Sequence, residues 1–162
     1  MANTGSVAAR KVVEYLGDEL SLAVAQIAEE SGVELGGIPP ECVANQNVSF
    51  ELSEKSQVVK YPVVLVYTDR IRNLLTEKFR TFSGKVRTVA EVRVSQDRIE
   101  GMEERLRLYV DAVTRVLDQH RGNWGEGAFF GGQYEVSIDA VKHGGKNFLQ
   151  VAKVMFEVDL SA

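Results

Sequence analysis

The sequence predicts an α+β fold, a mixed or antiparallel sheet packed by one long helix and by an N-terminal helix. Helical periodicity occurs in two separate stretches, and strand-like alternation lies between them and after the second. Strands that are grouped around a helix favour an antiparallel or mixed sheet with helices packed on it. We expect a single domain over residues 1–162, with a helix at 7–30, a connection at 32–47 and a core at 58–160.

The N-terminal helix is expected from Val7 to Glu30. Ser6 is the expected N-cap, and Ser31-Gly32 is the expected stop signal. The apolar positions step by three and four, which places them on one face: Val13, Leu16, Leu20, Val24 and Ile27.

The next segment mixes turn signals with strand signals. Paired glycines and Pro39-Pro40 make regular structure unexpected in the connection 32–47. Residues 48–52 alternate and predict a short strand. The second half of 58–67 is β-branched and aromatic and predicts a buried strand. Pro62 should lie at the start of that strand or on an edge, because proline cannot donate to a ladder.

Residues 69–82 have two possible structures. The spacing of four apolar residues favours a helical piece: Ile71, Leu74, Leu75 and Phe79. The same stretch could instead be the arm of a long hairpin that turns at Ser83-Gly84. Residues 86–94 alternate clearly and predict a half-buried strand.

The second long helix is expected between Asp97 and Arg121. Asp97 and Glu100 resemble a capping box, and Arg121-Gly122 is a C-terminal signal. Its expected apolar face is Ile99, Met102, Leu106, Tyr109, Val113, Val116 and Leu117.

The last part of the chain predicts a glycine-rich loop at 122–132, a strand at 134–141, a hairpin turn at 143–146 and a long strand at 148–160. The long strand is apolar on both faces, so both faces should be covered. The helix layer would cover one face. The first helix or a neighbouring subunit would cover the other.

The residues that could carry chemistry are few. Cys42 is the only cysteine, so it cannot form an internal disulfide. His120 and His143 have no metal-ligand spacing. The loop 125–131 follows a helix and precedes a strand, which is the wrong context for a phosphate loop. We therefore expect no catalytic, metal-binding or cofactor-binding residue and no enzyme, although sequence order alone leaves a dispersed triad open.

Charge is unevenly distributed in a chain of net charge −4. Acids dominate from Glu14 to Glu54, and bases gain from Arg70 to Arg107. The two parts could complement each other between neighbouring copies, or they could be ordinary solvated faces. No apolar run approaches the roughly 20 residues that span a bilayer, and no signal peptide is seen, so we expect no membrane partner.

Aromatic and basic residues are the candidate interface. The aromatics lie in the glycine-rich loop, and the bases lie in the stretch 78–87, where they are interleaved with aromatic residues. That pattern resembles a phosphate-contacting patch, and it is also typical of an exposed loop beside a sheet. The candidates are Trp124, Phe129, Phe130, Lys78, Arg80, Lys85 and Arg87.

Several segments resemble a family of tailed-phage virion proteins. These are Tyr61-Pro62-Val63-Val64-Leu65-Val66-Tyr67, Glu77-Lys78-Phe79-Arg80-Thr81-Phe82-Ser83-Gly84, Glu91-Val92-Arg93-Val94-Ser95-Gln96-Asp97-Arg98, Leu108-Tyr109-Val110-Asp111-Ala112-Val113, and Val141-Lys142-His143-Gly144-Gly145-Lys146-Asn147-Phe148-Leu149-Gln150. Their order of strand, strand, helix and hairpin, over about residues 58–160, is similar to that of phage tail terminator proteins of the neck region.

The resemblance implies a structural virion protein without catalytic residues. It implies a homo-oligomeric ring, with six copies the expected number, that caps the tail tube and joins the tail to the head. The implied partners are the tail tube protein and head-completion or neck proteins, with DNA passing through the lumen without sequence-specific binding. The implied location is the tail and neck of the virion, assembled in the host bacterial cytoplasm. A head-completion or stopper protein and a nucleic-acid-binding module that uses residues 78–87 are the alternatives.

Overall fold

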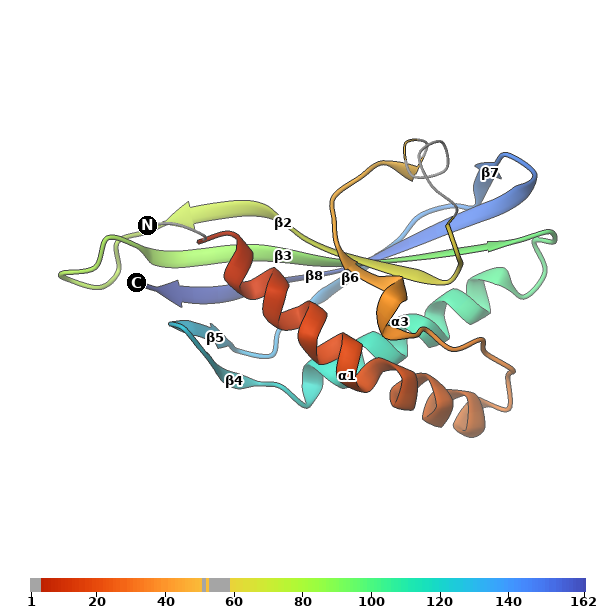
Figure 1. Ribbon diagram of the computed structural model, residues 1–162, viewed down its shortest axis with the longest axis horizontal. Helices are drawn as coiled ribbons and strands as arrows, with labels where there is room; N and C mark the ends of the chain where they lie inside the picture. The colour runs from red at the N-terminus through yellow and green to blue at the C-terminus, as the bar shows by residue number, and fades with distance from the viewer. Residues whose placement is uncertain (1–3, 51, 53–58) are drawn as a thin grey trace.

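The computed structural model describes residues 4–50, 52 and 59–162, and it confirms the α+β class. Within these residues, eight strands form one sheet in the order β1-β2-β3-β8-β5-β4, and β6 and β7 also pair with β8. The long helices α1 (Ser6–Ser31) and α3 (Met102–Asp118) pack against one face of the sheet (Figure 1).

The sheet is mixed, which is one of the two arrangements that the sequence predicted. β1 runs parallel to β2, and the other pairings are antiparallel. β8 pairs with β3 along one edge, and its other edge pairs with β7, β6 and β5 in turn. The strands are β1 (Val43–Asn45), β2 (Val63–Asn73), β3 (Ser83–Gln96), β4 (Gly122–Gly125), β5 (Ala128–Phe130), β6 (Glu135–Ile138), β7 (Lys142–Gly144) and β8 (Asn147–Ser161).

The main core lies between the two helices and one face of the sheet. In register, Val66 of β2 faces Ala90 of β3, which faces Val154 of β8, and all three are buried. The predicted face of the first helix is confirmed at Leu16, Leu20, Val24 and Ile27. The fifth predicted residue, Val13, is only partly buried, and its neighbour Val12 is fully buried instead.

The predicted helix ends are confirmed in one case and wrong in three. Gly32 ends α1 with φ 71° and donates to the Ala28 carbonyl, as a glycine C-cap does. The expected Ser6 N-cap is wrong, because Ser6 already lies in the helix and Gly5 precedes it.

The second helix is shorter at both ends than expected. The capping box at Asp97 does not form, and α3 begins at Met102 after Gly101, whose φ is 74°. The Gln96 side chain donates to the carbonyls of Arg98 and Glu100, which holds this stretch as a turn. Ile99 is consequently exposed. α3 ends at Asp118 instead of Arg121.

The segment after α1 contains regular structure, although its prolines and glycines predicted none. A short 3-10 helix, η1 (Pro40–Cys42), leads into β1, which can form because the edge of β2 offers it backbone partners. Cys42 is buried there. The predicted strand at 48–52 is wrong: residues 48 and 49 are irregular, Phe50 and Leu52 are helical, and residue 51 is outside the described residues.

The helical alternative for residues 69–82 is wrong, and the hairpin alternative is right. β2 begins directly after Pro62, as predicted, and continues to Asn73. The chain turns through residues 74–82, so Ser83-Gly84 already lies in β3 and is not the turn. Only glycine fits at residue 84, because a Cβ there would lie 1.9 Å from the Arg72 carbonyl oxygen.

The expected glycine-rich loop at 122–132 is a β-hairpin, formed by β4 and β5. Its turn residues Glu126 and Gly127 have φ of 52° and 80°. The next strand, β6, is shorter than predicted and spans 135–138 instead of 134–141. The hairpin that turns at Gly145-Lys146 and the long final strand are confirmed.

Part of the second face of the sheet is covered by the chain itself. Leu149 and Val151 of β8 are buried there, and so are Glu91 and Arg93 of β3, which makes the middle of β3 buried on both faces instead of half-buried. Arg93 donates to the Val48 carbonyl at 2.6 Å, so the segment after β1 crosses this face. The expectation that the first helix covers this face is wrong, since α1 packs on the other face, whereas cover by a neighbouring subunit stays a prediction.

Candidate assembly surface

A hairpin arm, residues 69–87, projects at one end of the molecule, and the last residues of β8 pair along its β3 side. It consists of the end of β2, the loop 74–82 and the start of β3. Figure 1 shows that the arm extends past the helix layer at one end of the molecule. Every residue from Asp69 to Thr81 is exposed. Of the arm residues, only Phe82 and Val86 belong to the core cluster, so the stretch 69–81 contributes nothing to it.

The arm is nevertheless well ordered by hydrogen bonds. The Asn73 side-chain oxygen accepts from the backbone N–H groups of Leu75 at 3.3 Å and Ser83 at 3.1 Å, which closes the loop. Where the loop returns to β3, Phe82 and Ala162 exchange two backbone hydrogen bonds of 3.0 and 2.8 Å. The arm is therefore a built projection held to the end of β8.

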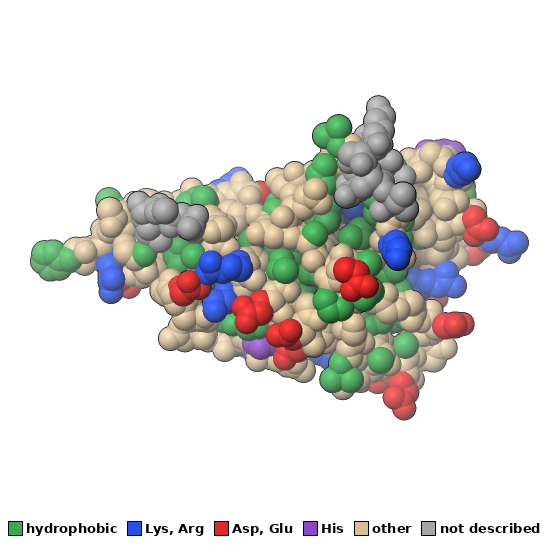
Figure 2. Space-filling view, viewed as in Figure 1, with side chains coloured by type: hydrophobic (Ala, Val, Ile, Leu, Met, Phe, Trp, Pro, Cys, Tyr) green, Lys and Arg blue, Asp and Glu red, His purple; other side chains and the backbone are tan. Residues whose placement is uncertain are grey.

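Three apolar side chains form the tip of the arm: Leu74, Leu75 and Phe79. They are exposed, and Phe79 is fully so, at 104%. Figure 2 shows a hydrophobic side chain at the far end of the molecule. Leu75 and Phe79 also have positive φ, 50° and 65°, which is unfavourable for a bulky residue. Their spacing was interpreted as the apolar face of a helix, so the sequence did not identify them as surface residues.

The predicted basic candidates divide into two pairs. Lys85 and Arg87 lie on β3 and face acids of their own chain, with Lys85 2.8 Å from Asp159 and Arg87 3.1 Å from Asp69. Lys78 and Arg80 lie in the exposed loop. Arg80 is 3.8 Å from Glu77, and Lys78 has no ion pair within the described part of the chain.

The predicted aromatic candidates also divide. Trp124 and Phe130 are buried in the core, so their assignment to an interface is wrong. The Trp124 indole donates to the His120 carbonyl at 2.6 Å, and its ring lies 5.4 Å from that of Phe130. Phe129, between them on β5, points outward and is 49% exposed. It lines one hollow with Leu74 and Thr76, beside the loop of the arm.

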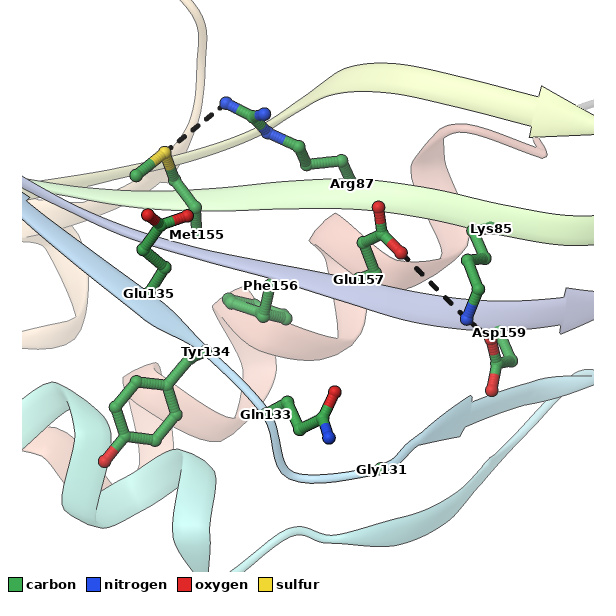
Figure 3. Close-up of a pocket in the computed structure, with 10 residues that line it drawn as sticks. All are labelled: Lys85, Arg87, Gly131, Gln133, Tyr134, Glu135, Met155, Phe156, Glu157 and Asp159. Atoms are coloured by element: carbon green, nitrogen blue, oxygen red, sulfur yellow. Dashed lines mark hydrogen bonds and ion pairs between the residues drawn. The ribbon is translucent and has the colours of Figure 1, made fainter.

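A second hollow, of about 370 Å³, lies on the sheet surface beside β8 (Figure 3). It is lined by charges of both signs, including Lys85, Arg87, Glu157 and Glu135. Lys85 lies between the carboxylates of Glu157 and Asp159, and Arg87 donates to the Met155 sulfur at 3.4 Å. Because acids of the chain already neutralise its bases, this hollow has little excess charge with which to hold an anion.

An acidic stripe runs along the outer face of α1. We define it as Glu14, Asp18, Leu22, Ala25 and Glu29, whose steps of four, four, three and four residues align them. All five are exposed, and the sequence has no Lys or Arg from residue 12 to 54. Figure 2 shows acidic side chains along the helix layer. The three acids have no ion-pair partner among the residues that the structure describes.

The buried titratable groups form a structural network. The Tyr67 hydroxyl donates to Glu91 at 2.8 Å, and Glu91 accepts from the Arg93 guanidinium at 2.6 Å. Burial, and then the hydrogen bond to Glu91, raises the pKa of the Tyr67 hydroxyl well above its ordinary value. With Arg93 bound to the Val48 carbonyl, this network attaches the crossing segment to the sheet.

The histidines lie on separate elements with separate neighbours. The His120 imidazole hydrogen-bonds to the Glu19 carboxylate and stacks on Tyr15, which connects the end of the α3 region to α1. His143 lies on β7 beside Phe148. No group of three or more His, Cys, Asp or Glu in the described residues is placed to hold a metal ion. Neither is any helix there long and apolar enough to cross a membrane.

No protein-family model matches the chain, and no curated protein sequence matches it.

Proposed function

We propose that this chain is a structural subunit of a tailed-bacteriophage virion, a tail terminator that forms a ring, caps the tail tube and joins the tail to the head. The arm carries the proposal. It is an ordered projection whose tip residues Leu75 and Phe79 are strained and exposed, and neither the strain nor the exposure benefits the isolated chain. A partner that buries the tip would account for both.

The order of elements supports the same proposal. The segments that resemble tail terminators occupy β2, the arm, β3, α3 and the β7–β8 hairpin, in the order strand, strand, helix and hairpin. The proposed partners are further copies of the chain, six in a ring, together with the tail tube protein and a neck protein. DNA would pass through the lumen without sequence-specific contacts, in a virion assembled in the bacterial cytoplasm.

The charge arrangement favours assembly over nucleic-acid binding. A phosphate approaching Lys85 or Arg87 would have to displace Asp159 or Asp69, and each such contact loses much of its electrostatic gain. Only Lys78 and Arg80 remain available from the stretch 78–87. We accordingly expect no shift of DNA in a gel at low salt, and a tight, salt-sensitive shift would favour the nucleic-acid module instead.

Native mass spectrometry tests the proposed function. The purified chain is measured alone and with the tail tube protein of the same phage, since a subunit can need its partner to close a ring. The proposal predicts one discrete oligomer in at least one condition. A monomer in both conditions would contradict it. Pull-down with the tail tube protein against the portal protein separates a terminator from a stopper.

A further inference from the structure

We infer that the arm of one copy docks on the acidic stripe of α1 of a second copy. This inference rests on the proposed function only in requiring that the chain assembles with itself. It names the two surfaces that meet, which that function leaves open.

The two surfaces match in chemistry. The tip presents Leu75 and Phe79 with Lys78 beside them, and Arg70 lies at the base of the arm. Neither Lys78 nor Arg70 has an ion pair within the described residues. The stripe also has an apolar centre, Leu22 and Ala25, but its flanking charges are of the opposite sign. They are the acids of the stripe, which have no ion-pair partner among the described residues. Docking would bury the apolar centres together and place positive groups against negative ones.

Among the described residues of its own copy, the arm has no comparable partner. It approaches α1 only at the start of the helix, where Ile71 lies against Gly5. The stripe begins at Glu14 and runs for about 22 Å in the direction away from the arm. The contact therefore joins two different patches and is heterologous, so repeating it generates a ring if the rotation closes and a filament if it does not.

Phe79 is the expected anchor of the contact. It is an aromatic side chain that is fully exposed in the free subunit, and such residues dominate interfaces once they are desolvated. Lys78 contributes mainly to the association rate and to partner choice. We expect Phe79→Ser to weaken self-association by at least about 30-fold.

Mixing two deficient variants tests the pairing. The arm variant combines Lys78→Glu with Phe79→Ser and keeps its stripe. The stripe variant combines Asp18→Lys with Leu22→Ser and keeps its arm. Each should be monomeric alone by native mass spectrometry. Mixed in equal amounts, they should form a 1:1 heterodimer that grows no further, because only one functional arm and one functional stripe meet.

Matched controls exclude nonspecific charge effects and misfolding. Lys146→Glu changes an exposed base on the β7–β8 turn, and Glu104→Lys changes an exposed acid on α3. Both should assemble as the wild type does. Thermal unfolding by circular dichroism checks that each variant is folded, and a variant that fails is replaced by its single substitutions.

The outcomes separate this inference from the proposed function. A discrete wild-type oligomer that either variant forms equally well overturns the pairing and leaves the ring intact. A mixture that stays monomeric also overturns the pairing. If the arm variant self-assembles normally but no longer binds the tail tube protein, the arm binds that protein and the pairing with the stripe is overturned. A wild type that is monomeric with and without tube protein overturns both.

Discussion

Replacing Phe79 by glycine should separate folding from assembly. The side chain is fully exposed and its φ is 65°, so the free subunit gains no burial from it and bears an unfavourable backbone conformation. Glycine adopts this conformation without strain. Phe79→Gly should therefore leave the folded subunit as stable as before, or slightly more stable, while removing the proposed contact.

The size of the effect follows from two opposing terms. A left-handed conformation costs a non-glycine residue about 1–2 kcal/mol. Glycine also gives the unfolded chain more conformational entropy, which lowers the stability of the folded state by about 0.4–1 kcal/mol. The net change in unfolding free energy should lie between about 0 and 1.5 kcal/mol, in the stabilising direction.

Urea denaturation at a concentration where the protein is monomeric measures this change, because assembly would add concentration-dependent stability. Phe82→Ala is the matched control. Phe82 lies three residues further along the arm but is buried in the core. Its replacement by alanine should therefore lower the unfolding free energy by about 3–5 kcal/mol. A loss of more than about 1 kcal/mol for Phe79→Gly would refute the reasoning, because it would mean that Phe79 packs within its own chain.

The core placement of the aromatics and the buried network give three further expectations. Phe130→Ala should lower the unfolding free energy by about 3–5 kcal/mol, whereas Phe129→Ala should lower it by less than about 1.5, and equal losses in denaturant titrations would contradict the burial of only one ring. Arg93→Met should cost about 3–5 kcal/mol because it leaves the Glu91 carboxylate buried without its cation, and adding Glu91→Leu should recover at least half; a double variant as unstable as the single one would argue against this. Because the pKa of Tyr67 is raised, the folded state keeps its proton while the unfolded chain loses it above about pH 10. Stability should then be constant with respect to this group below that pH and fall above it by up to about 1.4 kcal/mol per pH unit, and Tyr67→Phe should reduce that slope, which thermal unfolding between pH 9 and 11 would show.

Local sequence patterns predicted the elements that form the main core. The spacing of Leu16, Leu20, Val24 and Ile27 identified the buried face of α1, because a helix that packs on a sheet needs one apolar stripe. Alternation identified β3, a run of residues apolar on both faces identified the last strand, and glycines identified the end of α1 and the final hairpin. These features depend on neighbours in sequence.

Tertiary pairing accounts for the elements that were missed. β1 follows a Pro-Pro turn and exists because the edge of β2 accepts it. The hairpin β4–β5 looked like a loop because its glycines permit the positive φ of a tight turn. The apolar spacing from residue 71 onward is helical, yet β3 pairs with each of residues 70–73, and that pairing outweighs a weak helical preference.

The candidate surface was only partly predictable. Composition identified aromatic and basic residues that could meet a partner, but burial divides Phe129 from Trp124 and Phe130, and that division requires the fold. The charge segregation noted in the sequence persists as the acidic stripe. The tip was misread because Leu74, Leu75 and Phe79 are apolar, and the sequence alone does not tell an exposed hairpin tip from a buried helix face.

Negative-stain electron microscopy of the purified protein, alone and with the tail tube protein, tests the central proposal most directly. We expect uniform rings with a lumen wide enough for DNA, and Phe79→Gly should abolish them while the subunit remains folded. Fields of single small particles in both preparations of the wild type would contradict the proposed assembly.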